Sequence, residues 1–222
     1  MIYIIQTYGS MLLRAMGQTL LLTLLSLVFA MIIGMIFALM NVGRNRVFNF
    51  IGTVYVDAVR GVPLIVLAYF IYFGVPAGIQ AVGIQGFRLP ALQAGTIALS
   101  MNCGAYMAEI IRAGIQSVDK GQMEASRSLG LSYGKSMRLV VLPQAIRTMI
   151  PSIINQFIIT LKDTSILSVI GFPELTNTGK TIMGNTFKNL QTWAIVGIMY
   201  MIVIITLSKV AKRMERRINR GR

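Results

Sequence analysis

The feature that most constrains this chain is a run without a single charged residue, from Met16 to Val42. About 20 consecutive apolar residues are enough for a helix to cross a bilayer. Inside the hydrocarbon layer every backbone amide needs an internal partner, so only helices and closed barrels can span it. The run therefore predicts a transmembrane helix and places the chain among membrane proteins.

Four further apolar runs predict an all-α, polytopic membrane protein with five transmembrane helices. They cover residues 50–75, 92–116, 146–170 and 192–208, and polar segments separate them. Hydrophobic residues make up 55% of the chain and charged residues 13%, a balance that does not fit a soluble domain of this length. A sixth span would require splitting the second run at Pro63, and each half would be short. We expect one transmembrane domain over residues 1–222.

The distribution of positive charge predicts the orientation of the spans. The net charge is +14, and most Lys and Arg residues lie in three places: Arg44 with Arg46, the polar segment 119–146, and the C-terminal tail. Cytoplasmic loops carry the excess of positive charge, so these segments are expected inside the cell, with the N-terminus outside. The basic tail directly follows a span and is expected to bind lipid headgroups rather than nucleic acid. Its members are Lys209, Lys212, Arg213, Arg216, Arg217, Arg220 and Arg222.

The residues that the sequence lacks exclude several kinds of chemistry. Cys103 is the only cysteine and there is no histidine, which excludes an intrachain disulfide, a cysteine metal cluster and histidine-based triads. No GxxxxGK[ST] run is present, so the chain is not expected to bind ATP through that loop. We expect no catalytic residue, no metal site and no cofactor. The N-terminus shows no basic leader with a cleavage site, so the first span is expected to be retained.

The polar segment between the third and fourth spans has the signals of two short helices. Asp119 is expected to cap a helix that starts near Gly121, and Gly130 to end it with a positive φ angle. Ser132 is expected to cap a second helix over 133–141, and Pro143 to bend the chain before the fourth span. The first helix could dock in a partner's groove through Ala125 and Ser126, or the loop could lie on lipid. The residue types alone leave both interpretations open.

Charged and polar residues within the spans are candidates for a transport path, because burying them in lipid is costly. Lys162 and Asp163 lie in the fourth span, about 100° apart around the helix, so each needs its own partner or a wet cavity. A structural role, in which Lys162 pairs with another span or subunit, is the alternative. In the third span Asn102 and Tyr106 share a face, which could line a cavity or, with Gly104, serve helix packing.

Three more features of the spans are expected to be structural. Glu109 and Arg112 are three residues apart near the end of the third span and are expected to pair. Asp57 and Arg60 have the same spacing in the second span and are expected to neutralise each other. The stretch from Arg60 to Pro63 interrupts that helix and predicts a kink that faces the bundle interior.

Several motifs in their observed order resemble the permeases of ATP-binding cassette importers. Glu124-Ala125-Ser126, then Gly130, then Leu142-Pro143 looks like the EAA motif of these permeases, with Ser126 in place of the second alanine and Val140 in place of isoleucine. The stretches "DAVRGVPLIVLAYFIYFG" and "LPQAIRTMIPSIINQFIITLKDTSILSVIGFPEL" resemble the polar amino acid branch of the family. The resemblance covers about residues 18–214.

The resemblance implies a type I importer permease fold in the cell membrane and a role in amino acid transport. It implies that residues 117–146 form a coupling loop that docks in a separate ATP-binding subunit. The residues expected at that contact are Glu124, Ala125, Arg127, Leu129 and Gly130. It also implies a substrate site among the spans, for which the candidates are Asn102, Tyr106, Lys162, Asp163 and Thr164.

The implied partners are two ATP-binding cassette subunits, an extracytoplasmic amino acid-binding protein and a second permease, identical or closely related. The chain itself is then not an enzyme, because ATP hydrolysis belongs to another chain. Two alternatives come from other classes. A secondary porter or channel would work without an ATPase, and a membrane scaffold would recruit a partner without transporting anything.

Overall fold

The computed structural model describes the backbone of residues 1–43 and 45–219 and the side chains up to Arg213. Arg44 and the side chains of the last tail arginines therefore lie outside the described residues. All elements of the described part are helices. Their bounds are α1 (Ile2–Val42), α2 (Arg46–Gly61), α3 (Leu64–Tyr69), η1 (Phe70–Gly74), α4 (Val75–Ala81), α5 (Ala91–Gln116), α6 (Lys120–Ser128), α7 (Tyr133–Ser136), η2 (Met137–Val141), α8 (Leu142–Asp163), η3 (Thr164–Ile170), α9 (Leu175–Thr186) and α10 (Asn189–Asn219).

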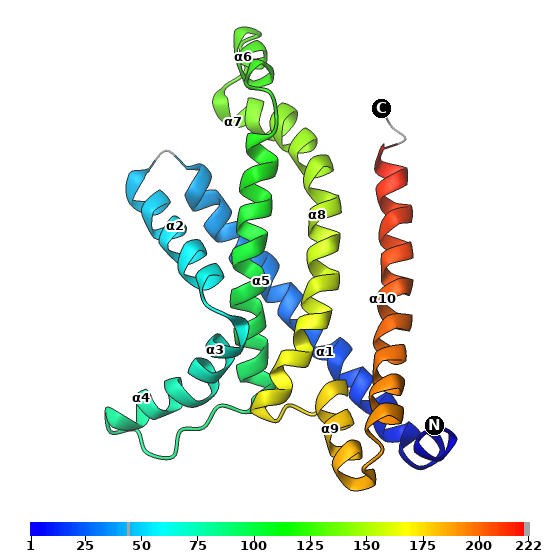
Figure 1. The fold of residues 1–222 in the computed structure, drawn as a ribbon. Coiled ribbons are helices and arrows are strands. Elements are labelled where there is room, and N and C mark those ends of the chain that lie inside the picture. Colours follow the sequence, from blue (N-terminus) through cyan, green and yellow to red (C-terminus); the bar gives the residue numbers. More distant parts are fainter. Residues whose placement is uncertain (44, 220–222) are drawn as a thin grey trace.

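The long helices run between two ends of an elongated molecule. Figure 1 shows α6 and α7 at one end, which we call the α6 end, and α4, α9 and the N-terminus at the other, the α9 end. Within the described part, four helical stretches are long and apolar enough to cross a membrane: Ile2–Val42, Leu64–Ala81, Tyr133–Ile170 and Asn189–Arg213. α5 has 26 residues and coincides with the predicted third span. Glu109 and Arg112 make it more polar than the four stretches named above. The all-helical prediction is confirmed, whereas five crossings and their orientation stay predictions.

The predicted interruption of the second span between Arg60 and Pro63 is confirmed, and the structure shows a break between two separate helices there. α2 ends at Gly61, Val62 is extended, and a new helix starts after Pro63 at Leu64. Proline has no amide hydrogen to donate, and inside a helix its ring would clash with the carbonyl oxygen four residues earlier. The helix therefore ends before Pro63. The apolar helix then continues to Ala81, through Pro76 in the first turn of α4, into residues predicted as loop.

Both prolines near the start of α4 and α8 follow a turn of π-helix. The amide of Val75 donates to the carbonyl of Phe70, one residue before Pro76. In the same way, the amide of Leu142 donates to Met137, one residue before Pro143. A π-turn shifts the hydrogen-bond register by one residue, which leaves room for a residue that cannot donate. Leu142 is helical, so α7, η2 and α8 form one continuous helix. Its axis turns between α7 and α8 (Figure 1), where the bend at Pro143 was predicted.

The segment predicted as a polar loop after the fourth span contains the helix α9. Its start is fixed by Glu174, whose carboxylate accepts hydrogen bonds from the amides of Thr176 and Asn177 at 2.7 and 2.5 Å. Glu174 is fully buried and also accepts a hydrogen bond from the hydroxyl of Tyr200 on α10, at 2.8 Å. Burial raises the pKa of this carboxyl above its ordinary value, against the opposing effect of its hydrogen bonds. The side chain joins α9 to α10 at the α9 end.

Small residues let α1 and α5 cross at short distance in the middle of the molecule. A Cβ at Gly34 would lie 2.5 Å from the Cβ of Met107, and one at Gly104 would lie 2.7 Å from Ile33. Ala108 lies in the same contact and is fully buried. The packing role expected for Gly104 is thus confirmed, and Ala108 takes part in it. Larger residues there would force the two helices apart.

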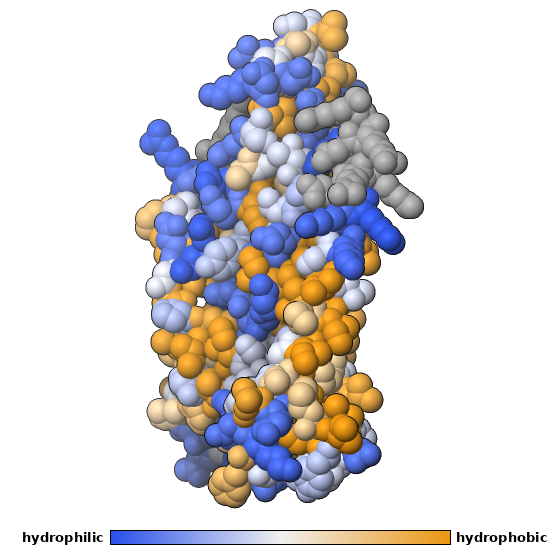
Figure 2. Space-filling model, turned by 45° about the vertical axis from the view of Figure 1, so that its right-hand side comes forward, coloured by the Kyte–Doolittle hydropathy of each residue, from blue (hydrophilic) through white to orange (hydrophobic). Residues whose placement is uncertain are grey.

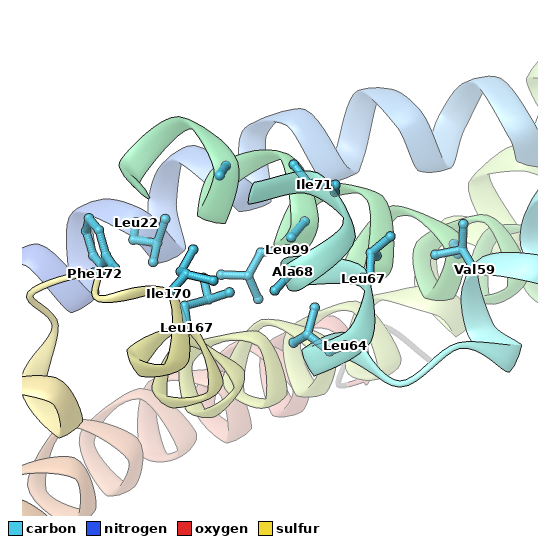
Figure 3. Packing of buried hydrophobic residues seen from close by; sticks show 13 residues of the cluster. Leu22, Val59, Leu64, Leu67, Ala68, Ile71, Leu99, Leu167, Ile170 and Phe172 are labelled. Carbon is cyan, nitrogen blue, oxygen red and sulfur yellow. The ribbon is translucent and has the colours of Figure 1, made fainter. Parts of the chain in front are cut away.

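The main apolar cluster joins α1, α2, α3, η1, α5 and η3 on the side of the crossing that faces the α9 end. Figure 3 shows Leu22, Leu99 and Leu167 converging with Ala68 and Ile71, and all five are buried. Figure 2 shows hydrophobic side chains on both sides of the middle of one face, with a column of hydrophilic ones between them, and many hydrophilic side chains toward the α6 end. Such a distribution is typical of a protein that is solvated at both ends by water and in the middle by lipid.

Candidate functional site

The short helix α6 presents the predicted coupling residues at the far end of the molecule (Figure 1). Its start and stop are as the sequence predicts: the Asp119 carboxylate accepts from the amide of Gly121 at 2.7 Å, and Gly130 has a φ of 86°. The five residues predicted to touch a partner are all exposed, and Leu129 is 84% exposed. An exposed leucine at the end of a short helix can contact an apolar groove in a partner.

Ser126, the departure from the EAA pattern, does not belong to the exposed face of α6. It is 5% exposed, its hydroxyl donates to the carbonyl of Met123 at 2.9 Å, and its own carbonyl accepts from Leu131. The expected small-residue face of Ala125 and Ser126 is therefore wrong for Ser126, because adjacent helical residues point about 100° apart. The serine stabilises the corner between α6 and α7 from inside.

A short turn and then a continuous helix lead from α6 to the charged part of the fourth span. Ser132 is the N-cap residue of α7, as predicted, and its carbonyl accepts a hydrogen bond from the amide of Ser136. Its side chain makes no capping hydrogen bond. From Tyr133 the helix continues through 38 residues to Ile170 and passes Lys162 and Asp163. Four residues, 129–132, therefore separate the end of α6 from the helix that carries Lys162 and Asp163.

The predicted path residues of α5 lie on a polar face opposite the packed one. Successive helical residues turn by about 100°, which places Asn102, Tyr106 and Glu109 within one narrow sector and Gly104 and Ala108 on the other side. Asn102 is 8% exposed, and the Tyr106 ring lies under the guanidinium of Arg60, 5.2 Å from its carbon. One face of α5 can therefore line a transport path while the opposite face packs against α1.

The register of α5 against α8 brings the predicted path residues to neighbouring levels. Gly95 packs against Leu167, and Gly114 packs against Met149. In this antiparallel arrangement Asn102 lies level with about residues 160–161, and Asp163 lies less than one helical turn further toward the α9 end. No direct contact joins Asn102 and Asp163 among the described residues.

The three polar candidates at the end of α8 have different surroundings. Lys162 is exposed on the surface of the chain and has no ion pair among the described residues. Asp163 is half-buried at the last turn of α8. Thr164 is fully buried, and its hydroxyl donates to the carbonyl of Leu161 at 2.7 Å. Asp163 and Lys162 are therefore open to a solute or a second subunit, whereas Thr164 packs inside the fold.

A polar cavity of about 380 Å³ lies between α2 and α5 at the α6 side of Tyr106. α2 contributes Asn49, Thr53, Asp57 and Arg60, which follow each other at helical spacing on one face. α5 contributes Glu109, Arg112 and Gln116.

One of the two ion pairs expected beside this cavity forms and the other does not. Arg112 donates through its Nε to Glu109 at 3.0 Å and through a terminal nitrogen to Gln116 at 2.8 Å, which confirms the Glu109–Arg112 pair. The expected neutralisation of Asp57 by Arg60 is wrong, since the ion pair of Arg112 with Glu109 is the one found among the described residues. The Arg60 side chain reaches across to Tyr106 instead, where the aromatic face attracts a cation.

Reasoning from the sequence missed this cavity because it treated α2 as the first half of an apolar span. The signal was present: polar side chains recur at positions 49, 53, 57 and 60, a helical stripe rather than an isolated pair. By the same helical spacing, Glu109 and Gln116 lie on the same face of α5 as Asn102 and Tyr106. A stripe on each of two facing helices predicts a wet cavity between them.

Comparison with known proteins places the chain among transport components. Residues 8–220 match the family described as binding-protein-dependent transport system inner membrane component. The glutamine transport system permease protein GlnP of Escherichia coli is 35% identical over 93% of this chain and 92% of its own length. The arginine transport system permease protein ArtQ of Bacillus subtilis is 34% identical over 93% and 91%.

Solved structures agree with these relatives in fold. A chain from the crystal structure of an amino acid ABC transporter with histidines is 38% identical and superposes with a TM-score of 0.89, covering 96% of both chains. A chain of the methionine ABC transporter MetNI, in inward-facing conformations, is 21% identical and has a TM-score of 0.79 over 95% and 97% of the two chains. The second likeness bears on the fold alone.

Proposed function

The chain belongs to the family of binding-protein-dependent transport system inner membrane components, and from that membership we propose that it is the membrane subunit of an ATP-driven importer of a polar amino acid. It lies in the cell membrane as a multi-pass protein. ATP hydrolysis takes place in separate cassette subunits, and an extracytoplasmic binding protein delivers the amino acid. A second permease, identical or closely related, completes the translocation path.

The observation that carries this proposal is the exposed helix α6, followed after a short turn by the continuous helix 133–170. The helix is capped by Asp119, ends at a glycine with φ of 86°, and presents Leu129 at 84% exposure. Such a helix fits a groove in a partner. Closure of two ATP-bound cassette subunits would move α6, and the continuous helix 133–170 would carry that motion to Lys162 and Asp163. A scaffold without transport needs no such connection.

The amino acid path in this proposal runs past Asn102 and Tyr106 of α5 and Asp163 and Lys162 of α8. Asp163 attracts the ammonium group of the amino acid, and Lys162 attracts its carboxylate. The amide of Asn102 supplies a donor and an acceptor for a polar side chain. Thr164 supports the site by holding the turn after Asp163, through its bond to Leu161. Glutamine and arginine are the first substrates to test, since relatives carry these names.

The test is uptake by the complete assembly in proteoliposomes. The permease, its cassette subunits and its binding protein are reconstituted, and labelled L-glutamine or L-arginine is followed with and without ATP. The proposal expects accumulation that requires ATP and the binding protein. Accumulation driven by an ion gradient in the absence of cassette subunits would favour the secondary porter instead.

A further inference from the structure

We propose that the polar cavity between α2 and α5 is a second amino acid-binding site, through which the substrate leaves toward the α6 end. The inference rests on the proposed function, because it concerns the same substrate at a later point of its path. Asp57 would bind the ammonium group and Arg60 the carboxylate. The ligand class is therefore an α-amino acid zwitterion, recognised by its main-chain groups.

The cavity has the size and chemistry of a small-molecule site. Its volume of about 380 Å³ lies in the range of known ligand pockets, roughly 300–1,000 Å³. The facing helices α2 and α5, together with Asn41 of α1, line it with polar side chains, although such groups are costly in a membrane protein without a partner. A cavity of this composition is wet and admits a charged solute.

Asp57 and Arg60 are free to bind such a solute. Among the described residues neither side chain has a hydrogen bond or an ion pair: the Arg60 guanidinium lies over the Tyr106 ring, and the charges of Arg60 and Asp57 act on Glu109 and Arg112 only through space, without contact. Glu109 and Arg112, in contrast, satisfy each other and Gln116. One carboxylate and one guanidinium, three residues apart and not joined, complement an ammonium and a carboxylate on one carbon atom.

The cavity also connects to the proposed central path. Tyr106 faces that path on α5, and Arg60 lies over its ring at 5.2 Å. Asn102, Tyr106, Glu109 and Gln116 follow one another along a single face of α5 from mid-helix toward the α6 end. An amino acid that leaves the site beside Asn102 therefore reaches Arg60 next, so the substrate would occupy the central site first and the cavity second.

Protection of a single thiol reports occupancy of this cavity directly. Cys103 is the only native cysteine and is 1% exposed, so a Thr53→Cys variant carries one accessible thiol, in the cavity wall. The variant is assembled with its cassette subunits in lipid nanodiscs and treated with a charged thiol reagent. At a concentration ten times the dissociation constant, L-glutamine leaves about a tenth of the sites free and slows modification about tenfold. L-arginine is expected to protect equally, because both ligands present the same main-chain groups.

Ligand analogues and variants identify the two contacts. N-acetyl-L-glutamine lacks the ammonium group and L-glutaminamide lacks the carboxylate, so neither is expected to protect. Asp57→Asn and Arg60→Gln, each in the Thr53→Cys background, should weaken protection by glutamine about tenfold or more, and Arg60→Lys should weaken it less. A thiol introduced at Arg46, on α2 but outside the cavity wall, should show no protection. Retained co-purification of the cassette subunits verifies that each variant folds.

The outcomes separate this inference from the proposed function. Full reactivity of the Thr53→Cys thiol in saturating glutamine overturns the site, and so does undiminished protection in an Asp57→Asn, Arg60→Gln double variant. ATP-driven uptake that persists in either case leaves the proposed function standing. Absence of ATP-driven uptake in the wild-type assembly, whatever the labelling shows, removes the proposed function instead.

Discussion

Replacing Gly130 by valine tests whether the corner after α6 couples the two activities of the assembly. Gly130 has a φ of 86°, and a Cβ built there meets nothing within 4 Å. The substitution therefore adds no clash, and its cost is the backbone strain of a side chain in the left-handed region. That strain is about 1–2 kcal/mol for an ordinary residue and up to about 3 kcal/mol at strained positions. Valine lies at the upper part of this range because it is β-branched.

The expected result is a loosened α6 and a loss of coupling. A cost of about 1.4 kcal/mol raises the open population of a local segment about tenfold. Hydrogen exchange of the amides in 120–131 should accelerate by that factor or more. In proteoliposomes, ATP hydrolysis should continue while amino acid uptake per ATP falls.

Gly134→Ala is the matched control for this prediction. Gly134 lies in α7, has helical backbone angles, and also has open space at its Cβ. Alanine there removes the helix penalty of glycine, about 1 kcal/mol, so exchange and coupling should be unchanged or slightly improved. The reasoning is refuted if Gly130→Val exchanges and transports like the wild type, or if Gly134→Ala shows the same losses.

Two further predictions concern buried or path carboxylates. Burial raises the folded-state pKa of Glu174 above its ordinary value of 4.5, so the folded protein binds the proton more tightly. The free energy of unfolding should then rise as the pH falls from the raised pKa toward 4.5, and Glu174→Gln should lack this rise in thermal melts across pH. A wild-type minus variant difference that is flat with pH would contradict this. Asp163→Asn should raise the KM of uptake about tenfold, through loss of a charged contact, while Ser165→Ala should not. Equal kinetics for wild type and Asp163→Asn would remove Asp163 from the path.

The sequence predicted the local signals of the fold well, because each depends on a few adjacent residues. Asp119 caps α6 and Gly130 ends it, as expected. A short acidic side chain can accept hydrogen bonds from the first amides of a helix, and glycine can adopt the positive φ that ends one. The Glu109–Arg112 pair also formed, because both partners lie on one helix. The family itself was evident from the order of such motifs.

The features that depend on distant contacts could not be read in the same way. The π-turns before Pro76 and Pro143 keep helices continuous where proline rules predict a break, because a shift in register removes the need for the missing amide. The Arg60 side chain lies over Tyr106, 46 residues later in the sequence, and not beside Asp57. The spacing of residues along α2 cannot predict a contact with another helix. The helix α9 was missed because its stabilising partner, Tyr200, comes from a different helix.

The role of α6 as the contact for an ATP-driven subunit is tested most directly by co-purification from native membranes. The permease is isolated under gentle conditions, and the bound chains are identified for the wild type, for a Glu124→Ala, Gly130→Val double variant, and for Gly134→Ala. The account predicts an ATP-binding subunit with the wild type and with Gly134→Ala, and its loss from the double variant. A wild-type permease that carries no ATPase, or a double variant that keeps it, would contradict the account.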